Sequence, residues 1–256
     1  MKTNFHTHTY RCNHAKGTDE EYVKAAIESG FETLGFADHT PWKYDSNYVS
    51  SIRMETTEID EYIFSLKELK AKYKEQIDIK IGLECEYFPD YFPWLKDLLM
   101  QKEIDYIILG NHYHKSDIFG GYYGSKTKDA SILKRYVDDC IDGLKTGLYS
   151  YLAHPDLIDY AYVESEAYRK EMGRLCKYAR KNDVLLEYNV TGIITNRNYP
   201  NDIFWRIVAR EGCKAVIGFD AHKPEHLKRS DLYEKAKRYL DTLGIKRVDQ
   251  IPLDKF

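Results

Sequence analysis

Imidazole and carboxylate side chains recur along this 256-residue chain at spacings that allow several of them to act together. His6 and His8 are two residues apart, and so are Asp220 and His222. In an extended segment, residues two apart point to the same side of the backbone, so each pair can bind one ion. Imidazole and carboxylate together suit Zn, Fe or Mn. Five further candidate ligands are scattered along the chain: His14, His39, Glu84, His112 and His154.

These nine candidate ligands are too many for one ion. A catalytic zinc needs three protein ligands and one open position. The set could therefore hold two or three ions, with a carboxylate such as Glu84 bridging two of them. Single histidines are more often ordinary core or surface residues than ligands, so the prediction depends on the whole set. We expect the two remaining histidines to lie outside it, with His114 next to a ligand and His226 at the start of the last helix.

The candidate ligands follow short β-rich runs that alternate with longer helical stretches. The predicted strands are Lys2–Phe5, Thr33–Ala37, Ile77–Leu83, Tyr106–Leu109, Tyr151–Ala153, Val184–Tyr188 and Ala215–Gly218. The predicted helices are Asp19–Ser29, Thr57–Tyr73, Tyr91–Met100, Ala130–Lys145, Glu164–Lys181, Pro200–Glu211 and Glu225–Leu243. Thr18 and Glu21 form a capping box at the start of the first helix. The β–α alternation predicts parallel strands joined by right-handed crossovers.

The positions of the candidate ligands favour a closed barrel over an open sheet. Six of the seven predicted strands have a candidate at or just beyond the C-terminal end, and only the strand that ends near Glu187 lacks one. In a parallel barrel, all these ends open onto one face. In an open sheet they would be spread along a line, too far apart for one site. We therefore predict an α/β barrel that forms a single domain over residues 1–256.

Composition limits the classes of partner. The chain has 38 Lys and Arg, 41 Asp and Glu, and a formal net charge of -3. A nearly neutral chain with mixed charges has no general electrostatic attraction to nucleic acid or to an anionic membrane. No stretch approaches the ~20 apolar residues of a membrane span, and no secretory signal is expected. The five widely spaced cysteines fit reduced thiols, and therefore a cytoplasmic protein, better than a disulfide framework.

Six short motifs, in order along the chain, make the sequence similar to a known family. They are Phe-His-Thr-His-Thr at residues 5–9, Ala-Asp-His at 37–39, Gly-Leu-Glu at 82–84, Gly-Asn-His at 110–112, Ala-His-Pro-Asp at 153–156 and Gly-Phe-Asp-Ala-His at 218–222. The set resembles the polymerase and histidinol phosphatase (PHP) family and spans nearly the whole chain. Residues 6–17 and the run Phe-Ala-Asp-His-Thr-Pro at 36–41 look most like its histidinol-phosphate phosphatase branch.

The resemblance implies a distorted, TIM-like (β/α)7 barrel with three divalent metal ions, which could be Zn, Mn or Fe. Matched motif by motif, the first ion would be held by His6, His8, Glu84 and Asp220, the second by Glu84, His112 and His154, and the third by His14, His39 and His222. Some members of the family have Asp where this chain has His14, and this exchange of ligand type bears on which metal the third site prefers. Adjacent ions activate water and neutralise phosphoryl charge. We hypothesise that a hydroxide bridging the first two ions attacks phosphorus in line.

Other side chains are expected to complete the reaction. The leaving alkoxide needs a proton, and the candidate acids are Asp220, His222 and His39. Arg197, in the loop after the sixth predicted strand, is the candidate phosphate-binding residue because its planar fork matches a phosphate group. Asn189 is a candidate for orienting the substrate. The sequence leaves four carboxylates open as acceptors for a histidinol ammonium: Asp45, Glu86, Asp117 and Asp156.

The sequence leaves more than one function open. The branch resemblance implies hydrolysis of a small phosphate monoester, L-histidinol phosphate, to L-histidinol and phosphate in histidine biosynthesis. The alternatives are a PHP-type protein-tyrosine phosphatase, a PHP-type nuclease or phosphodiesterase, and a metal-binding protein without catalysis. The chain has no polymerase domain and no clear basic and aromatic groove, which disfavours a nucleic-acid substrate. The oligomeric state cannot be read from the sequence.

Overall fold

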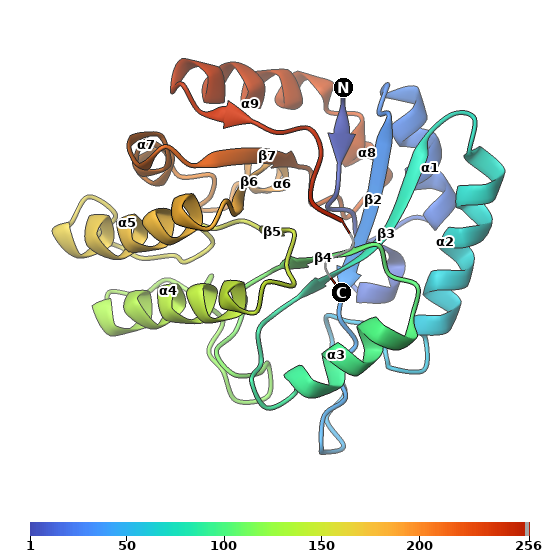
Figure 1. Ribbon diagram of the computed structural model, residues 1–256, viewed down its shortest axis with the longest axis horizontal. Helices are drawn as coiled ribbons and strands as arrows, with labels where there is room; N and C mark the ends of the chain where they lie inside the picture. The colour runs from blue at the N-terminus through green and yellow to red at the C-terminus, as the bar shows by residue number, and fades with distance from the viewer. Residues whose placement is uncertain (254–255) are drawn as a thin grey trace.

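The computed structural model describes all residues except 254–255, and its described part contains one sheet of eight parallel strands with helices around it (Figure 1). The strands are β1 (Thr3–Asn4), β2 (Thr33–His39), β3 (Asp78–Cys85), β4 (Tyr106–Leu109), β5 (Tyr151–Leu152), β6 (Leu185–Asn189), β7 (Lys214–Gly218) and β8 (Lys246–Arg247). The helices are a 3-10 turn η1 (Tyr10–Cys12), α1 (Asp19–Glu28), α2 (Ile59–Tyr73), α3 (Phe92–Gln101), α4 (Ala130–Lys145), α5 (Glu166–Lys181), α6 (Val190–Ile194), α7 (Asp202–Glu211), α8 (Pro224–Leu227) and α9 (Ser230–Thr242). Among these described helices, none combines the length and the apolar character that crossing a membrane requires.

The sheet curls until its two sides meet at the C-terminal ends of the strands. Strand order follows the sequence, and every neighbouring pair is parallel. Just beyond β1 and β7, Thr7 and Ala221 form a parallel bridge. There the His8 amide donates to the Ala221 carbonyl at 2.9 Å, and the Ala221 amide donates to the His6 carbonyl at 3.2 Å. The predicted distorted α/β barrel is therefore confirmed.

The C-terminal segment closes the opposite end of the barrel. β8 pairs with the start of β7, and the carbonyls of Asp249 and Pro252 accept hydrogen bonds from the hydroxyls of Thr3 and Ser150, each at 2.6 Å. Ile251 is buried among the side chains that face the interior of the barrel. The sequence predicted seven strands and missed β8, because two charged residues carry no alternating apolar pattern.

The interior of the barrel is filled by one aromatic and aliphatic cluster. The hydroxyl of Tyr106 reaches across this interior to within 2.8 Å of the Phe5 carbonyl and 2.9 Å of the Phe36 carbonyl. The ring of Tyr106 packs directly against the backbone of Gly82. A Cβ atom at Gly82 would lie 2.5 Å from two atoms of this ring, so only glycine fits there. The cluster consists of Phe5, Ala37, Tyr106, Ile108, Tyr151, Ala153, Leu185, Val216 and Ile251.

Amphipathic helices cover the outside of the sheet (Figure 1). In α4, for example, Leu133, Tyr136 and Cys140 follow the three- and four-residue spacing of one buried face. At the start of α1, the predicted capping box is confirmed: the Thr18 side chain accepts from the Glu21 amide, and the Glu21 side chain accepts from the Thr18 amide. These helices form the second, larger core against the outer face of the strands.

Several helix ends differ from the prediction. α7 begins at Asp202 rather than Pro200, because the side chain of Asn201 caps the amides of the first turn. The predicted last helix is two helices, α8 and α9, since the backbone at Arg229 leaves the helical conformation with a ψ of 56°. The short helix α6 was not predicted. Its N-cap is Asn189, whose side chain accepts a hydrogen bond from an amide in the first turn.

The packing of Tyr106 against β3 predicts the effect of adding one methyl group. Gly82→Ala should lower the free energy of unfolding by about 1–3 kcal/mol, because the new methyl overlaps a ring that is buried on all sides. Urea denaturation followed by circular dichroism measures this change. The matched control is Gly121→Ala, since a Cβ there meets nothing within 4 Å, and it should stay within about 0.5 kcal/mol of the unsubstituted protein. Equal stability of the two variants would contradict the described interior.

Candidate metal centre

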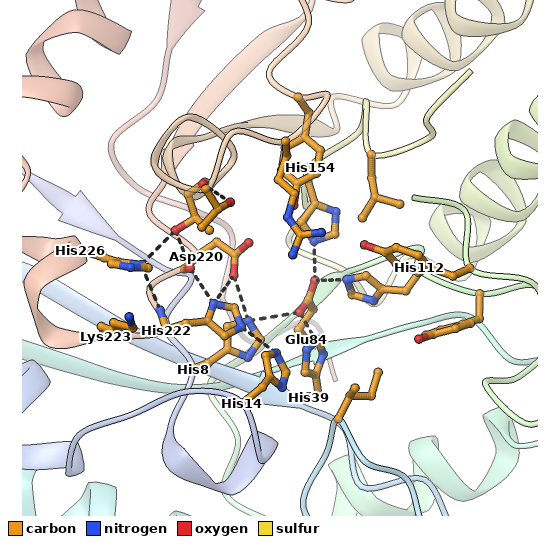
Figure 2. Close-up of a pocket in the computed structure, with 18 residues that line it drawn as sticks. His8, His14, His39, Glu84, His112, His154, Asp220, His222, Lys223 and His226 are labelled. Atoms are coloured by element: carbon orange, nitrogen blue, oxygen red, sulfur yellow. Dashed lines mark hydrogen bonds and ion pairs between the residues drawn. The ribbon is translucent and has the colours of Figure 1, made fainter. Parts of the chain in front are cut away.

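The nine predicted ligands come together at the C-terminal mouth of the barrel, and Figure 2 shows those that line the cavity. Eight of them line a cavity of about 470 Å³, and His6 is fully buried beside them. They lie at or after the ends of successive elements: His6 and His8 after β1, His14 after η1, His39 in β2, Glu84 in β3, His112 after β4, His154 after β5, and Asp220 and His222 after β7.

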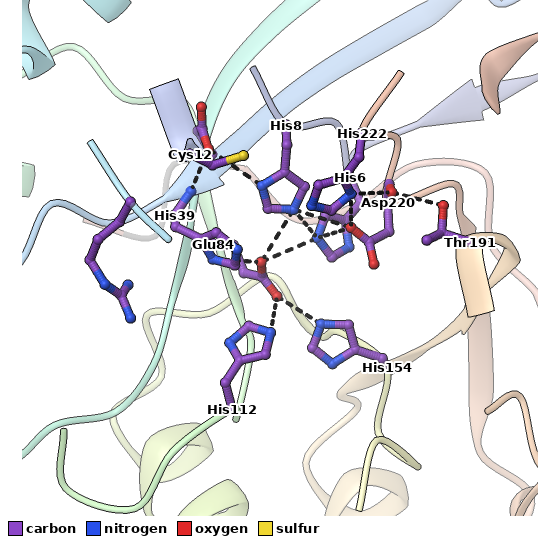
Figure 3. Close-up of polar contacts among 12 residues, drawn as sticks. His6, His8, Cys12, His39, Glu84, His112, His154, Thr191, Asp220 and His222 are labelled. Carbon is purple, nitrogen blue, oxygen red and sulfur yellow. Dashed lines mark hydrogen bonds and ion pairs between the residues drawn. The ribbon is translucent and has the colours of Figure 1, made fainter. Parts of the chain in front are cut away.

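Glu84 lies at the centre of this cluster, with both carboxylate oxygens facing imidazole nitrogens (Figure 3). Two rings approach one oxygen, and three rings approach the other. Oε1 lies 2.8 Å from His154 Nε2 and 3.4 Å from His112 Nε2. Oε2 lies 3.1 Å from His39 Nδ1 and 3.4 Å from both His6 Nε2 and His8 Nε2.

Asp220 brings a second carboxylate into the cluster. Its Oδ1 lies 3.1 Å from His8 Nε2 and 3.3 Å from His222 Nδ1. The other nitrogen of His222, Nε2, faces His14 Nε2 at 2.9 Å. His39 completes a trio with these two histidines, in which one nitrogen of each ring lies within 4.8 Å of the others. Asp220 therefore connects the rings around Glu84 with an overlapping trio of histidines, since His39 belongs to both.

Within the described residues, Glu84 Oε2 and His39 Nδ1 are buried atoms of the cluster that have no hydrogen-bond partner. Buried polar atoms are nearly always satisfied, so such atoms need an explanation. In addition, the Nε2 atoms of His6 and His8 face each other at 3.2 Å. A cation between these converging oxygens and nitrogens would satisfy them at once, because each offers it a lone pair. The residues present therefore fit divalent metal ions.

The converging atoms form overlapping groups that can hold such ions. One ligand atom of each member lies within 4.8 Å of the others in His6–His8–Asp220, in His6–Glu84–His154, in His8–His39–Glu84 and in His14–His39–His222. Sharing of residues between groups is what a cluster with bridging carboxylates requires. The division into three sites, the number of ions and their identity stay predictions.

Three more carboxylates, all fully buried, contact the ligand rings from the side away from the cavity. A carboxylate behind a metal-binding histidine fixes the orientation of the ring and raises its basicity. One of them, Glu187, belongs to the sixth strand, the strand for which the sequence indicated no ligand. The contacts are His6 Nδ1 to Glu187 Oε1 (2.8 Å), His112 Nδ1 to Glu86 Oε1 (2.9 Å) and His8 Nδ1 to Asp38 Oδ1 (3.4 Å).

The carboxylate of Glu86 is itself held by a buried arginine. Arg53 donates to both oxygens of Glu86 at 3.1 Å and to Asp117 at 3.2 Å, and Trp42 Nε1 donates to Glu86 at 3.0 Å. Burial raises the pKa of Glu86, but Arg53 and His112 outweigh it and lower that pKa to about 2. Glu86 is therefore ionised and fully engaged in holding His112.

Burial and neighbouring charges act in opposite directions on the rings. Burial lowers the pKa of His6, but the nearby carboxylates, Glu187 first, outweigh it and raise the pKa to about 10. Burial lowers the pKa of His222 to about 3 and that of His39 well below its usual value. His39 and His222 are thus neutral rings with lone pairs available. A cation that binds His6 must displace a proton, so metal binding strengthens as pH rises.

The backbone is strained at two of the predicted ligands. Asp220 has a φ of 49° and His154 has a φ of 28°, which is the left-handed region that residues other than glycine rarely adopt. Such conformations concentrate at functional sites. Asp220 is held in place by Thr191 Oγ1, which donates to its carbonyl at 2.8 Å, and by Asn189 Nδ2, 3.2 Å from its carboxylate. Asn189, predicted to orient substrate, lies behind Asp220 and is not part of the cavity lining.

The remaining predicted residues divide between the cavity and the surrounding structure. Arg197 lines the cavity. His226, expected to lie outside the site, also lines it, with Nδ1 3.3 Å from Thr191 Oγ1. His114 lies outside it and pairs with Asp139 at 2.8 Å. The wall also contains loop residues that no sequence motif indicated, namely Ile52, Tyr113, Tyr122, Leu157, Thr195, Tyr199 and Lys223.

Comparison with known proteins gives this arrangement a family. The sequence pattern of the PHP domain matches residues 4–191, which run from the end of β1 past β6 and include most of the cluster. The chain belongs to the PHP domain family. The resemblance inferred from the six motifs is therefore confirmed.

Named relatives resemble this PHP domain over most of its length. A Bacillus subtilis protein named "Histidinol-phosphatase" is 23% identical over 257 residues, which cover 87% of this chain and 94% of that protein. A Deinococcus radiodurans protein named "Probable histidinol-phosphatase" is 28% identical over 231 residues, covering 86% and 85%. The structure of histidinol phosphate phosphatase from Lactococcus lactis, complexed with zinc, L-histidinol and phosphate, matches with a TM-score of 0.74 at 19% identity and covers 98% of each chain. At that identity, the match shows a shared fold.

The contact between Glu187 and His6 predicts a loss of metal affinity in Glu187→Gln. The neutral amide cannot hold the His6 ring as the carboxylate does, so affinity for zinc should fall by about 10- to 100-fold. Competition with a chromogenic chelator measures it. Glu166→Gln, an exposed carboxylate on α5, is the matched control and should bind zinc as the unsubstituted protein does. Equal affinity in both variants would remove Glu187 from the support of the centre.

Proposed function

We propose that this PHP domain is a metal-dependent phosphomonoesterase that hydrolyses L-histidinol phosphate to L-histidinol and phosphate. The observation that carries the proposal is the convergence of seven imidazoles and two carboxylates on one cavity around Glu84. Relatives named histidinol-phosphatase support the substrate. So does the Lactococcus lactis enzyme, whose structure contains zinc, L-histidinol and phosphate.

The cluster would hold three divalent ions, with zinc, manganese and iron as the candidates. When bound, such ions activate water near neutral pH and neutralise the charge of the phosphoryl oxygens. The chain's own contribution is to fix the ligands before substrate arrives. Glu187, Glu86 and Asp38 hold the rings of His6, His112 and His8 in the orientations that face the cavity.

The phosphate group also meets positive side chains. Arg197 and Lys223 both line the cavity and are exposed. In the described part of the chain, no carboxylate forms an ion pair with either of them, so both are available to a dianion. A guanidinium can donate two parallel hydrogen bonds to a phosphate group, whereas an ammonium acts as a point charge. We therefore assign Arg197 to phosphate binding and Lys223 to general attraction of the substrate.

The departing alkoxide oxygen needs a proton, and the candidate acids are Asp220, His222 and His39, all of which line the cavity. The His222 side chain is 19% exposed, against 7% for Asp220 and 6% for His39. A donor to a leaving group must reach the substrate from the cavity side. His222 is therefore the most accessible of the three from the cavity, but its lowered pKa keeps the ring neutral, so Asp220, His222 and His39 all stay candidates for the acid.

Three tyrosines line the cavity together with the metal cluster. Tyr113 and Tyr122 pack with ring centroids 5.5 Å apart, and the Tyr199 ring lies 5.8 Å from that of His154. Tyrosine faces can stack on an imidazole and attract an ammonium through cation–π contact. None of the four carboxylates considered from the sequence as ammonium acceptors lines the cavity (Asp45, Glu86, Asp117 and Asp156). The tyrosines are therefore the candidates for holding the histidinol part.

A phosphate-release panel tests the function. The panel compares L-histidinol phosphate, a phosphotyrosine peptide and an oligonucleotide, each before chelation, after chelation and after return of zinc or manganese. We expect release from L-histidinol phosphate above the other two, loss of this activity on chelation, and its recovery on metal return. Preference for the peptide or the oligonucleotide would favour the protein-tyrosine phosphatase or the nuclease. Full activity in the stripped protein would refute a metal-dependent reaction.

The role assigned to Arg197 predicts the kinetics of Arg197→Ala. Loss of charge-assisted hydrogen bonds to phosphate should lower kcat/KM for L-histidinol phosphate by about 10- to 100-fold. Steady-state phosphate release measures this value. Arg169→Ala changes an exposed arginine of α5 outside the cavity lining and is the matched control. Unchanged kcat/KM in both variants would exclude Arg197 from phosphate binding.

A further inference from the structure

One thiol lies against the metal cluster without a part in the ligand sets above. Cys12 is the last residue of the 3-10 turn η1, between His8 and His14, and its side chain is fully buried. The other four cysteines are also buried, but their contacts lie away from the imidazoles. The Cys85 thiol contacts the Thr40 hydroxyl, and the Cys213 thiol contacts a carbonyl on α5.

The sulfur of Cys12 faces several histidines at once. Cys12 stands two residues before His14 in the chain, directly before the Asn13 that ends the turn. One nitrogen of His8, one nitrogen of His222 and this sulfur all lie within 4.8 Å of one another. In Figure 3, the sulfur of Cys12 points toward the His8 ring and the cluster. His14 and His222 also belong to the trio that includes His39, so the thiol lies beside that trio.

The conformation of η1 fixes this placement. The Thr9 side chain caps the turn, and Asn13 ends it in the left-handed conformation with a φ of 65°. The chain then reverses, so that His14 Nδ1 lies 2.6 Å from the Cys12 carbonyl. Arg11 anchors the turn from the other side through Asp19, at 2.9 Å. Because of these contacts, Cys12 is held beside the metal cluster, next to the loop that carries His14.

We propose that Cys12 is a sulfur ligand of the ion held by His14, His39 and His222. The proposal rests on the metal centre proposed above and adds a fourth protein atom to one of its sites. On binding, the thiol releases its proton to water and a sulfur–metal bond forms, with no change in oxidation state. Three imidazoles and one thiolate suit zinc, and a soft sulfur ligand selects zinc or iron over manganese. This site would therefore discriminate between metals that the oxygen-rich part of the cluster accepts alike.

Cobalt(II) substitution tests the assignment by absorption, independently of turnover. A thiolate bound to cobalt(II) gives an intense charge-transfer band in the near ultraviolet that nitrogen and oxygen ligands do not give. We expect this band in the full chain loaded with cobalt, and we expect Cys12→Ser to lose it. Cys176→Ser, a buried cysteine on α5 outside the metal groups, is the matched control and should keep the band.

The outcomes separate this proposal from the proposed function. If the chain binds cobalt and hydrolyses L-histidinol phosphate but shows no band, the role of Cys12 is overturned and the proposed phosphatase activity stands. Retention of the band in Cys12→Ser would overturn it as well. Failure of the chain to bind cobalt at all would refute both the sulfur ligand and the metal centre. If Cys12→Ser does not fold, the spectrum of the unsubstituted protein still decides the question.

Discussion

The buried carboxylate of Glu84 lies within 3.4 Å of five imidazole nitrogens, and the mouth of the barrel is built around this constraint. Burying a carboxylate is costly unless opposite charge and hydrogen bonds compensate for its lost hydration. Within the described residues, one of its oxygens has no hydrogen bond, although three ring nitrogens surround it. Divalent cations between these atoms would neutralise the charge and accept the lone pairs that face one another. The same cations are what a phosphate dianion requires.

The backbone that closes the barrel also carries the ligands. The bridge between Thr7 and Ala221 joins the two sides of the sheet, and each of these residues stands between two predicted ligands. Closure of the barrel and assembly of the centre are therefore one structural event. Behind the rings, Glu187, Glu86 and Asp38 continue the pattern outward, and Arg53 balances Glu86. The site is thus layered, with the ligand rings between the Glu84 carboxylate and a second set of buried carboxylates behind them.

Much of this could be predicted from the sequence, because a parallel barrel converts strand ends into neighbours. The positions of His6, His39, Glu84 and His154 after separate β-rich runs indicated both the fold and a metal cluster. Features without a local pattern were missed. β8 consists of two charged residues and depends on pairing with β7. The supporting role of Glu187 depends on its contact with His6, which is 181 residues away in the chain. The aromatic wall of the cavity comes from loops, whose paths no periodic sequence pattern predicts.

The central claim is that ions occupy both sides of the Glu84 carboxylate. Anomalous scattering from crystals of the zinc-loaded protein tests it most directly, because it locates metal without reference to activity. The account predicts anomalous peaks at bonding distance, about 2.0–2.2 Å, from each of the two Glu84 oxygens, with the facing imidazoles completing each site. Peaks confined to the protein surface, or a Glu84 carboxylate with no metal beside either oxygen, would contradict it.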